Sequence, residues 1–136
     1  MPRCELSSNT ASSAGFSGAT LRLLSRADIV SLHVPLRPET RHLIGEAERA
    51  LMKPTALLVN TSRGGIIDEA ALAAALRSGK LGGAAIDVFE REPLPPSPHF
   101  EGCPNLILTP HVAGVTAEAN ERVSFLIADK VLEALA

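Results

Sequence analysis

Short runs of apolar, often β-branched residues alternate along the chain with segments whose apolar residues recur at helical spacing. This alternation predicts βαβ units, and therefore an α/β fold built on a parallel sheet of about four strands flanked by helices. The predicted strands span residues 28–34, 55–60, 83–88 and 106–109. The predicted helices span residues 21–26, 40–53 and 68–78, followed by a long final helix that Thr116 caps.

Some of these segments carry more detailed expectations. Residues 55–60 form a nearly continuous apolar run, which predicts a strand covered on both faces. Gly79 is expected to end the 68–78 helix in a left-handed conformation. The apolar residues of the final helix lie near helical spacing, which predicts packing against the sheet, with packing on a protein partner as the alternative. They are Val123, Leu126, Ile127, Val131 and Leu135.

Composition narrows the classes of function. The chain has 136 residues, of which 46% are hydrophobic and 21% charged, as in a globular domain with a buried core. A net charge of -2, four Phe and no Trp or Tyr argue against nucleic acid or an anionic membrane as partner. No stretch approaches the roughly 20 apolar residues that span a bilayer.

The chain is predicted to divide into a leader and a domain. Residues 1–20 are rich in Ser, Thr, Ala and Gly, which predicts a disordered or weakly ordered leader before a domain at 21–136. Cys4 and Cys103 lie in no CxxC or metal-binding pattern. We therefore expect no metal site, and a reducing, cytoplasmic setting.

Polar residues follow every predicted strand. They are His33 after the first, Thr61, Ser62 and Arg63 after the second, Asp87 near the end of the third, and His111 after the fourth. Because the carboxyl ends of parallel strands share one edge of the sheet, these residues are expected to converge on a site.

Arg63 and His111 are the first candidates for chemistry. Arg63 lies in Asn-Thr-Ser-Arg-Gly-Gly, where two glycines permit a tight turn and the guanidinium can bind a carboxylate. The alternative is a surface arginine near Asp68 or Glu69. His111 follows a proline, and histidine is a residue type suited to proton transfer near neutral pH. The alternative is a loop histidine whose hydrogen bonds are satisfied locally.

The acidic candidates are more ambiguous. Glu92 could orient His111 and fix which ring nitrogen carries the proton, but Glu90 lies in the same charged run. Asp87, near the end of a buried strand, needs donors from a ligand amide or, more commonly, from local backbone amides. Of the other histidines, His42 is interpreted as helix surface and His99 as loop.

Three ordered motifs carry a specific family resemblance. ADIVSLHVPLRPETRHLI, LLVNTSRGGIIDEAALAAALRSGKLGGAAIDVFEREPLP and NLILTPHVAG together resemble the D-isomer-specific 2-hydroxyacid dehydrogenases. The resemblance covers residues 21–136. It implies the distal part of an NAD(P)-binding domain, with an incomplete Rossmann-type sheet. The implied reaction is hydride transfer between NAD or NADP and a small D-2-hydroxyacid or 2-oxoacid, of a kind similar to glyoxylate or hydroxypyruvate.

The resemblance also implies roles for individual residues. Arg63 would hold the substrate carboxylate and carbonyl, His111 would exchange the proton at the C2 oxygen, and Glu92 would tune that histidine. Asp87 would lie near the nicotinamide carboxamide. Contacts with the cofactor are implied for Val34, Pro35, Thr61, Ser62, Arg63, Asp87, His111, Ala113 and Gly114.

The sequence departs from the family in one respect that affects both fold and function. No GxGxxG turn occurs in it, so the usual cradle for the pyrophosphate is missing, and feeble or no turnover by this chain is expected. Taking residues 28–34 as strand 3 and 55–60 as strand 4 of the 3-2-1-4-5-6 order leaves a gap in the sheet. The two strands then either pair directly, or the chain associates with something, or it folds poorly.

The resemblance leaves two functional classes open. Corepressors related to these dehydrogenases act through protein contacts, so a non-catalytic interaction module is the alternative to an enzyme. In complete members the region of the final helix also contributes to dimer contacts, which leaves a homodimer open.

Overall fold

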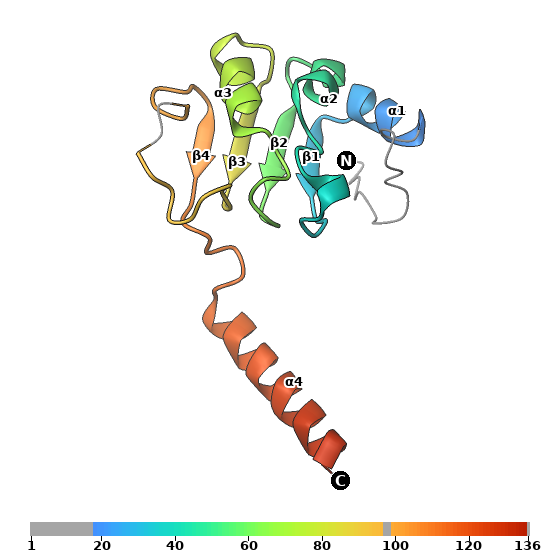
Figure 1. The fold of residues 1–136 in the computed structure, drawn as a ribbon, viewed down its shortest axis with the longest axis vertical. Helices are drawn as coiled ribbons and strands as arrows, with labels where there is room; N and C mark the ends of the chain where they lie inside the picture. The colour runs from blue at the N-terminus through green and yellow to red at the C-terminus, as the bar shows by residue number, and fades with distance from the viewer. Residues whose placement is uncertain (1–17, 97–98, 136) are drawn as a thin grey trace.

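A single parallel sheet is the framework of the computed structural model, which describes residues 18–96 and 99–135 (Figure 1). The strands are β1 (Ile29–Leu32), β2 (Leu57–Asn60), β3 (Gly83–Ile86) and β4 (Leu106–Leu108). The helices are α1 (Gly18–Arg26), α2 (Glu46–Leu51), α3 (Glu69–Arg77) and α4 (Ala117–Leu135), with a 3-10 turn at Pro38–Thr40. The α/β class is confirmed. Residues 1–17 of the expected leader lie outside the described part, whereas residues 18–20 are helical.

The four strands pair in the sequential order β1-β2-β3-β4, and every pair is parallel. Ile29 pairs with Leu57 and Leu57 pairs with Gly83, so β1 lies directly beside β2. Of the three alternatives for the predicted gap, direct pairing is therefore the one observed. The assignment of these strands as 3 and 4 was wrong, because that order would place two further strands between them.

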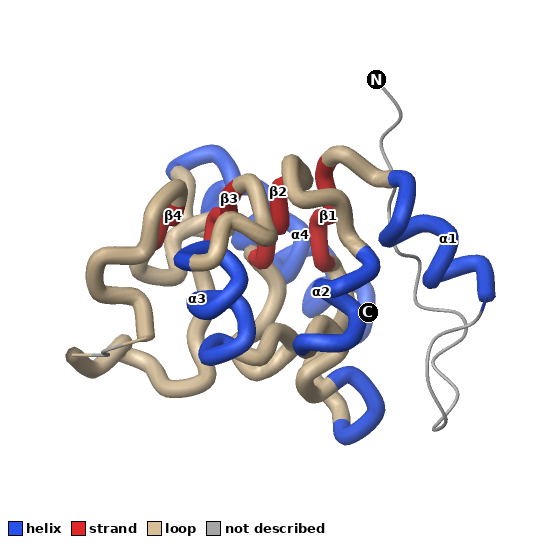
Figure 2. The backbone as a smooth tube through the Cα atoms, turned by 90° about the horizontal axis from the view of Figure 1, so that it is seen from above, coloured by secondary structure: helices blue, strands red, loops and turns tan. Residues whose placement is uncertain are grey.

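In the described part of the chain, helices cover one face of the sheet only. Figure 2 shows α2 and α3 on the same side, and α1 contacts α2. Val30, Leu58 and Ile86 point into the core on this side and are at most 3% exposed. On the opposite face Leu57 is 43% exposed. The prediction that residues 55–60 are covered on both faces was wrong, because the apolar run reports hydrophobicity but not which neighbours are present.

The predicted helix over residues 40–53 is instead a turn followed by the short helix α2. Between them the backbone hydrogen-bonds to the neighbouring loop: His42 N donates to Gly65 O at 2.8 Å and Ile44 N donates to Ile66 O at 3.2 Å. These tertiary hydrogen bonds replace the helical ones, and His42 has φ of 50°. The interpretation of His42 as helix surface was therefore wrong.

Helix α3 follows its sequence signals closely. The Asp68 side chain accepts a hydrogen bond from Ala71 N at 3.0 Å and so caps the first turn. Gly79, just after the helix, has φ of 66°, which confirms the predicted left-handed position. Leu72 and Leu76 from this helix are buried against the sheet.

Helix α4 extends away from the rest of the molecule (Figure 1). Its cap is as predicted, since Thr116 Oγ1 accepts from Ala119 N at 3.0 Å. None of its described residues is buried, and Leu126 is 59% exposed. The prediction that α4 packs against the sheet was therefore wrong. No helix within residues 18–96 and 99–135 combines the length and apolarity needed to cross a membrane.

We predict that Asp68→Ala lowers the free energy of unfolding by about 1 kcal/mol, because the capping oxygen at the start of α3 is lost. Asp68→Asn should lower it less, because its side-chain oxygen can still accept from Ala71 N. Urea denaturation followed by circular dichroism measures both. Equal stability of Asp68→Ala and the wild type would contradict the role of this cap.

Candidate active site

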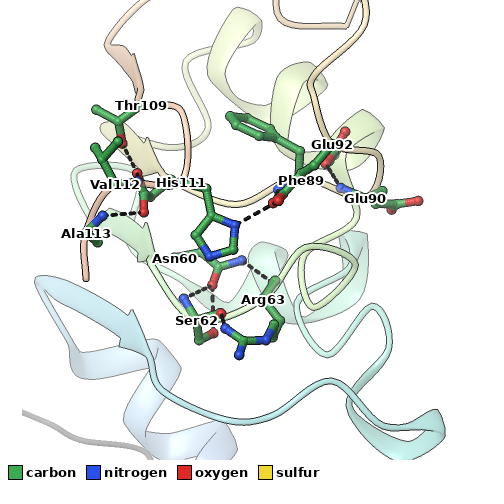
Figure 3. A network of polar contacts seen from close by, with 12 residues as sticks. Asn60, Ser62, Arg63, Phe89, Glu90, Glu92, Thr109, His111, Val112 and Ala113 are labelled. Atoms are coloured by element: carbon green, nitrogen blue, oxygen red, sulfur yellow. Dashed lines mark hydrogen bonds and ion pairs between the residues drawn. The ribbon is translucent and has the colours of Figure 1, made fainter. Parts of the chain in front are cut away.

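The loops that follow β2, β3 and β4 meet at one edge of the sheet, as expected for parallel strands (Figure 3). Asn60 to Gly65 form the first loop, Asp87 to Glu92 the second, and Thr109 to Gly114 the third. Two of these loops, with the residues that follow them, border a cleft of about 450 Å³. It is lined by Phe89, Glu92, Pro93, Leu94, Leu108, Thr109, Pro110 and His111.

Glu92 and His111 form a direct contact across this edge. His111 Nδ1 lies 2.7 Å from Glu92 Oε2, while Glu92 Oε1 accepts from Phe89 N at 2.9 Å. The hydrogen bond from His111, and then the one from the Phe89 amide, hold the pKa of the Glu92 carboxyl below its usual range. Because an ionised carboxylate only accepts, Nδ1 carries the proton. The predicted contact of Glu92 with His111 is confirmed.

The same contact leaves Nε2 as the nitrogen of His111 that can exchange a proton with a ligand. In Figure 3 this nitrogen points to the side on which Asn60 and Arg63 lie. The backbone of His111 has φ of 54°, an uncommon conformation for a residue other than glycine. Such backbone strain is typical of functional sites.

Asp87 fixes the loop that carries His111. Its side chain is 2% exposed and accepts from Thr109 Oγ1, from Val112 N at 2.9 Å and from Ala113 N at 2.8 Å. Burial alone would raise the pKa of the Asp87 carboxyl, but the hydrogen bonds from Thr109, Ala113 and Val112 together outweigh it and lower this pKa. The expected backbone donors are thus present. An approach of Asp87 to a nicotinamide stays a prediction.

Asn60 organises the loop that carries Arg63, and sequence reasoning did not single it out. Its side chain is 1% exposed, accepts from Ser62 N at 3.1 Å and donates to Arg63 O at 3.0 Å. A polar residue at the end of an otherwise apolar strand was the available signal. Arg63 itself is exposed, and its Nη1 donates to Ser62 O at 2.6 Å.

Arg63 forms no hydrogen bond or ion pair with Glu92 or His111 in the described part of the chain. Within the described residues it forms no ion pair, so the alternative of a surface pair with Asp68 or Glu69 is not observed. It also does not line the cleft beside His111. The guanidinium is therefore available to a ligand anion, with one donor already used by its own loop.

Gly64 allows the Arg63 loop to lie against the Glu92 loop. A Cβ at Gly64 would lie 1.7 Å from Phe89 O, so a side chain cannot fit there. Gly65 has φ of 77°, which favours glycine. The expected tight turn is confirmed. Its physical reason is the close approach of two backbone segments, at Gly64 and at Phe89.

The remaining predicted cofactor residues are distributed around the same edge. Val34 is buried, whereas Pro35, Thr61 and Gly114 are exposed. Pro35 O accepts from Thr40 Oγ1 at 2.7 Å, which shapes the loop after β1. Their contacts with a cofactor stay predictions. Glu90, the alternative to Glu92, contacts His42 and Arg41 instead of His111.

The fold and these loops together define an α/β domain whose ligand edge carries a carboxylate–imidazole pair. The family described as D-isomer specific 2-hydroxyacid dehydrogenase, NAD binding domain, matches residues 5–113. Since this match covers most of the chain, the chain belongs to that family of dehydrogenases.

Individual relatives agree with this assignment. The chain is 58% identical to the (S)-sulfolactate dehydrogenase of Chromohalobacter salexigens, over 83% of this chain and 37% of the relative. It is 50% identical to the glyoxylate reductase of Aeropyrum pernix, over 81% of this chain and 33% of the relative. A crystal structure of a glyoxylate reductase from Paecilomyes thermophila superimposes with a TM-score of 0.77 and 39% identity. The superposition covers 85% of this chain and 35% of the glyoxylate reductase chain.

The chain thus spans between 33% and 37% of the length of these two relatives. The TM-score of 0.77 over 85% of this chain shows that the described fold is similar to that of a family member.

We predict that Gly64→Ala lowers the free energy of unfolding by about 3 kcal/mol, because a new Cβ would overlap the Phe89 carbonyl. Gly18→Ala is the matched control, since among the described residues no atom beyond its chain neighbours and its own helix backbone lies within 4 Å of the added Cβ. That control should change stability by no more than about 0.5 kcal/mol. Chemical denaturation of both variants tests the pair, and similar effects would contradict the close approach.

The lowered pKa of Asp87 gives a prediction for acid stability. A carboxyl whose pKa is lowered in the folded state stabilises the fold above its ordinary pKa of 3.8, and this contribution is lost as the pH falls through the folded value. Asp87→Asn should therefore be less stable at neutral pH and lose less stability below pH 3.8. Urea denaturation at a series of pH values measures the slopes. Parallel curves would contradict the assignment.

Proposed function

We propose that this chain carries the acid–base and carboxylate-binding residues of an NAD(P)-dependent oxidoreductase for small D-2-hydroxyacids or 2-oxoacids. The contact between Glu92 Oε2 and His111 Nδ1 at 2.7 Å is the observation that carries the proposal. The relatives named above are dehydrogenases and reductases, which favours an enzyme over an interaction module.

The proton chemistry follows from the His111 ring. Glu92 holds the proton on Nδ1, so Nε2 can accept a proton from a hydroxyl at C2, or donate one to a carbonyl oxygen when the ring is charged. In the charged state the Glu92 carboxylate stabilises the imidazolium.

Arg63 is suited to orient the substrate. A guanidinium offers a planar set of donors that matches a carboxylate in a two-pronged geometry, and its charge is permanent. Binding the carboxylate at Arg63 would place the neighbouring carbon near the side of His111 that carries Nε2. The chemistry thus matches a 2-oxoacid better than a simple aldehyde or ketone.

The described residues fit the reacting end of a dinucleotide better than its phosphates. Thr61, Ser62 and the Ala113–Gly114 segment would border the nicotinamide end, where the cofactor when bound supplies the hydride. The first turns of α2, α3 and α4 are occupied by their own side chains, from Glu48, Asp68 and Thr116. Each of these three helix N-termini therefore has one backbone amide fewer to offer to a pyrophosphate.

We therefore propose that this chain alone turns over slowly or not at all. NADH oxidation with glyoxylate or hydroxypyruvate should stay near the uncatalysed rate. A clear rate that His111→Ala abolishes would support the chemistry but contradict the need for phosphate-binding groups outside the described residues.

The cellular setting and assembly belong to the same proposal. Cys103 is a free thiol, which supports a reducing compartment such as the cytoplasm. The use of NAD or NADP as cofactor stays a prediction. The formation of a homodimer stays a prediction as well.

Carboxylate binding at Arg63 is the direct test of the proposal. We expect glyoxylate to perturb the NMR signals of Arg63 and of the His111 ring, and Arg63→Lys to weaken this binding about tenfold, since Lys lacks the two-pronged fork. Arg122→Lys on the exposed helix α4 is the matched control and should bind as the wild type does. Equal affinities of Arg63→Lys and the control would contradict the proposal.

A further inference from the structure

The turn that carries Glu92 is held at a second point, at Glu90. Glu90 N donates to Glu69 Oε1 at 2.6 Å, and Glu90 Oε1 lies 2.8 Å from His42 Nε2. Arg41 adds a longer contact of 3.5 Å to the other carboxylate oxygen. One residue of this turn is thus bound at its amide by α3 and at its carboxylate by the loop after β1.

His42 also binds the loop that carries Arg63. Its backbone amide donates to Gly65 O at 2.8 Å, two residues after Arg63. Its side chain reaches the Glu90 carboxylate, two residues before Glu92. The backbone and the side chain of one residue therefore connect the two loops that carry Arg63 and Glu92.

Glu69 binds from the opposite side, at the first residue of α3. Burial raises the pKa of the Glu69 carboxyl, while the hydrogen bond from the Glu90 amide opposes this rise. Repulsion from the Glu90 carboxylate adds to the rise. Holding a half-buried carboxylate near a second one is unfavourable unless it makes hydrogen bonds, so the contact with the Glu90 amide offsets a real cost.

We propose that His42 and Glu69 are positioning residues that act through Glu90 to hold Glu92 in place for His111. The three residues Glu90, His42 and Glu69 are called the Glu90 clamp below. The clamp touches neither substrate nor cofactor. This proposal rests on the proposed function only in that His111 is taken as the acid–base group whose partner Glu92 the clamp positions.

The clamp differs from an ordinary surface ion pair in what it should affect. The side chains of His42 and Glu90 are 40% and 31% exposed, and pairs in that setting contribute little to the free energy of unfolding. Loss of the His42 side chain should therefore leave the unfolding midpoint nearly unchanged. It should change the state of the His111 ring, because the turn carrying Glu92 loses one anchor.

The His42→Asn variant separates the side chain from the backbone. His42 has φ of 50°, and Asn adopts this conformation more readily than most residues. The shorter side chain cannot span the distance to Glu90, whereas the amide can still donate to Gly65 O. Glu90→Ala removes the same contact from the other partner.

The test is the ratio of the Nε2–H to the Nδ1–H form of the neutral His111 ring, measured by long-range ¹H–¹⁵N NMR on the ligand-free chain. In the wild type the Nδ1–H form should dominate. We expect His42→Asn, Glu90→Ala and Glu69→Ala each to raise the ratio about fivefold, as for the loss of one hydrogen bond of ordinary net strength. Glu69→Gln keeps an oxygen acceptor for the Glu90 amide and should restore the wild-type ratio.

Glu133→Ala is the matched control, because it removes a carboxylate from an exposed ion pair with Lys130 on α4. Its His111 ratio should equal that of the wild type. An unchanged ratio in folded His42→Asn and Glu90→Ala would overturn the proposal, as would an equal change in the control. Since no ligand is used, failure of glyoxylate binding would leave this result standing, and the two proposals can fail separately.

Discussion

The close approach of Gly64 to the Phe89 carbonyl is the contact on which the site depends. A Cβ at Gly64 would lie 1.7 Å from that oxygen. Two backbone segments of the chain therefore touch at a distance that the Cβ of any other residue would prevent. This contact brings the loop after β2 against the loop after β3. Arg63 and Glu92 lie on either side of it, and His111 reaches the assembly through Glu92. A larger residue at Gly64 would separate these loops whatever their other contacts.

Carboxylates that accept hydrogen bonds from main-chain amides stabilise the loops after β3 and β4. Glu92 accepts from Phe89 N, Glu69 from Glu90 N, and Asp87 from Val112 N and Ala113 N. Each bond places a fixed negative charge near the edge that carries His111. Charged acceptors of this kind form stronger hydrogen bonds than neutral ones. Glu92 accepts from the Phe89 amide of its own turn with one carboxylate oxygen and contacts the His111 imidazole with the other.

Sequence reasoning predicted the features that depend on local or periodic signals. The parallel sheet, the cap at Asp68 and the left-handed Gly79 all follow from residue types at short spacing. The contact between Glu92 and His111 followed from convergence of strand ends together with the family resemblance. His42 could not be placed in this way, because hydrogen bonds to Gly65 and Ile66, distant in sequence, replace the predicted helix. The role of Glu69 was missed for the same reason, because its partner Glu90 is distant in sequence. Asn60 bonds locally to Ser62 and Arg63, and its role was missed although a polar residue at the end of an apolar strand was a signal.

The exposed surfaces show the limit of hydrophobic patterns most clearly. Val123 and Ile127 lie one turn apart on α4, while Phe125 and Leu132 lie toward the other side of the helix, and all four are at least half exposed. The apolar residues thus lie on both sides of α4, and their period does not identify any surface that they contact. On the open face of the sheet, Leu57 is likewise an apolar residue that is 43% exposed. Among the described residues, neither α4 nor the open face of the sheet contributes a contact to the site. The carboxylate contacts that build it come from the loops at the strand ends and from the first turn of α3. Its geometry is therefore set by the main-chain contacts around Phe89 and Glu90.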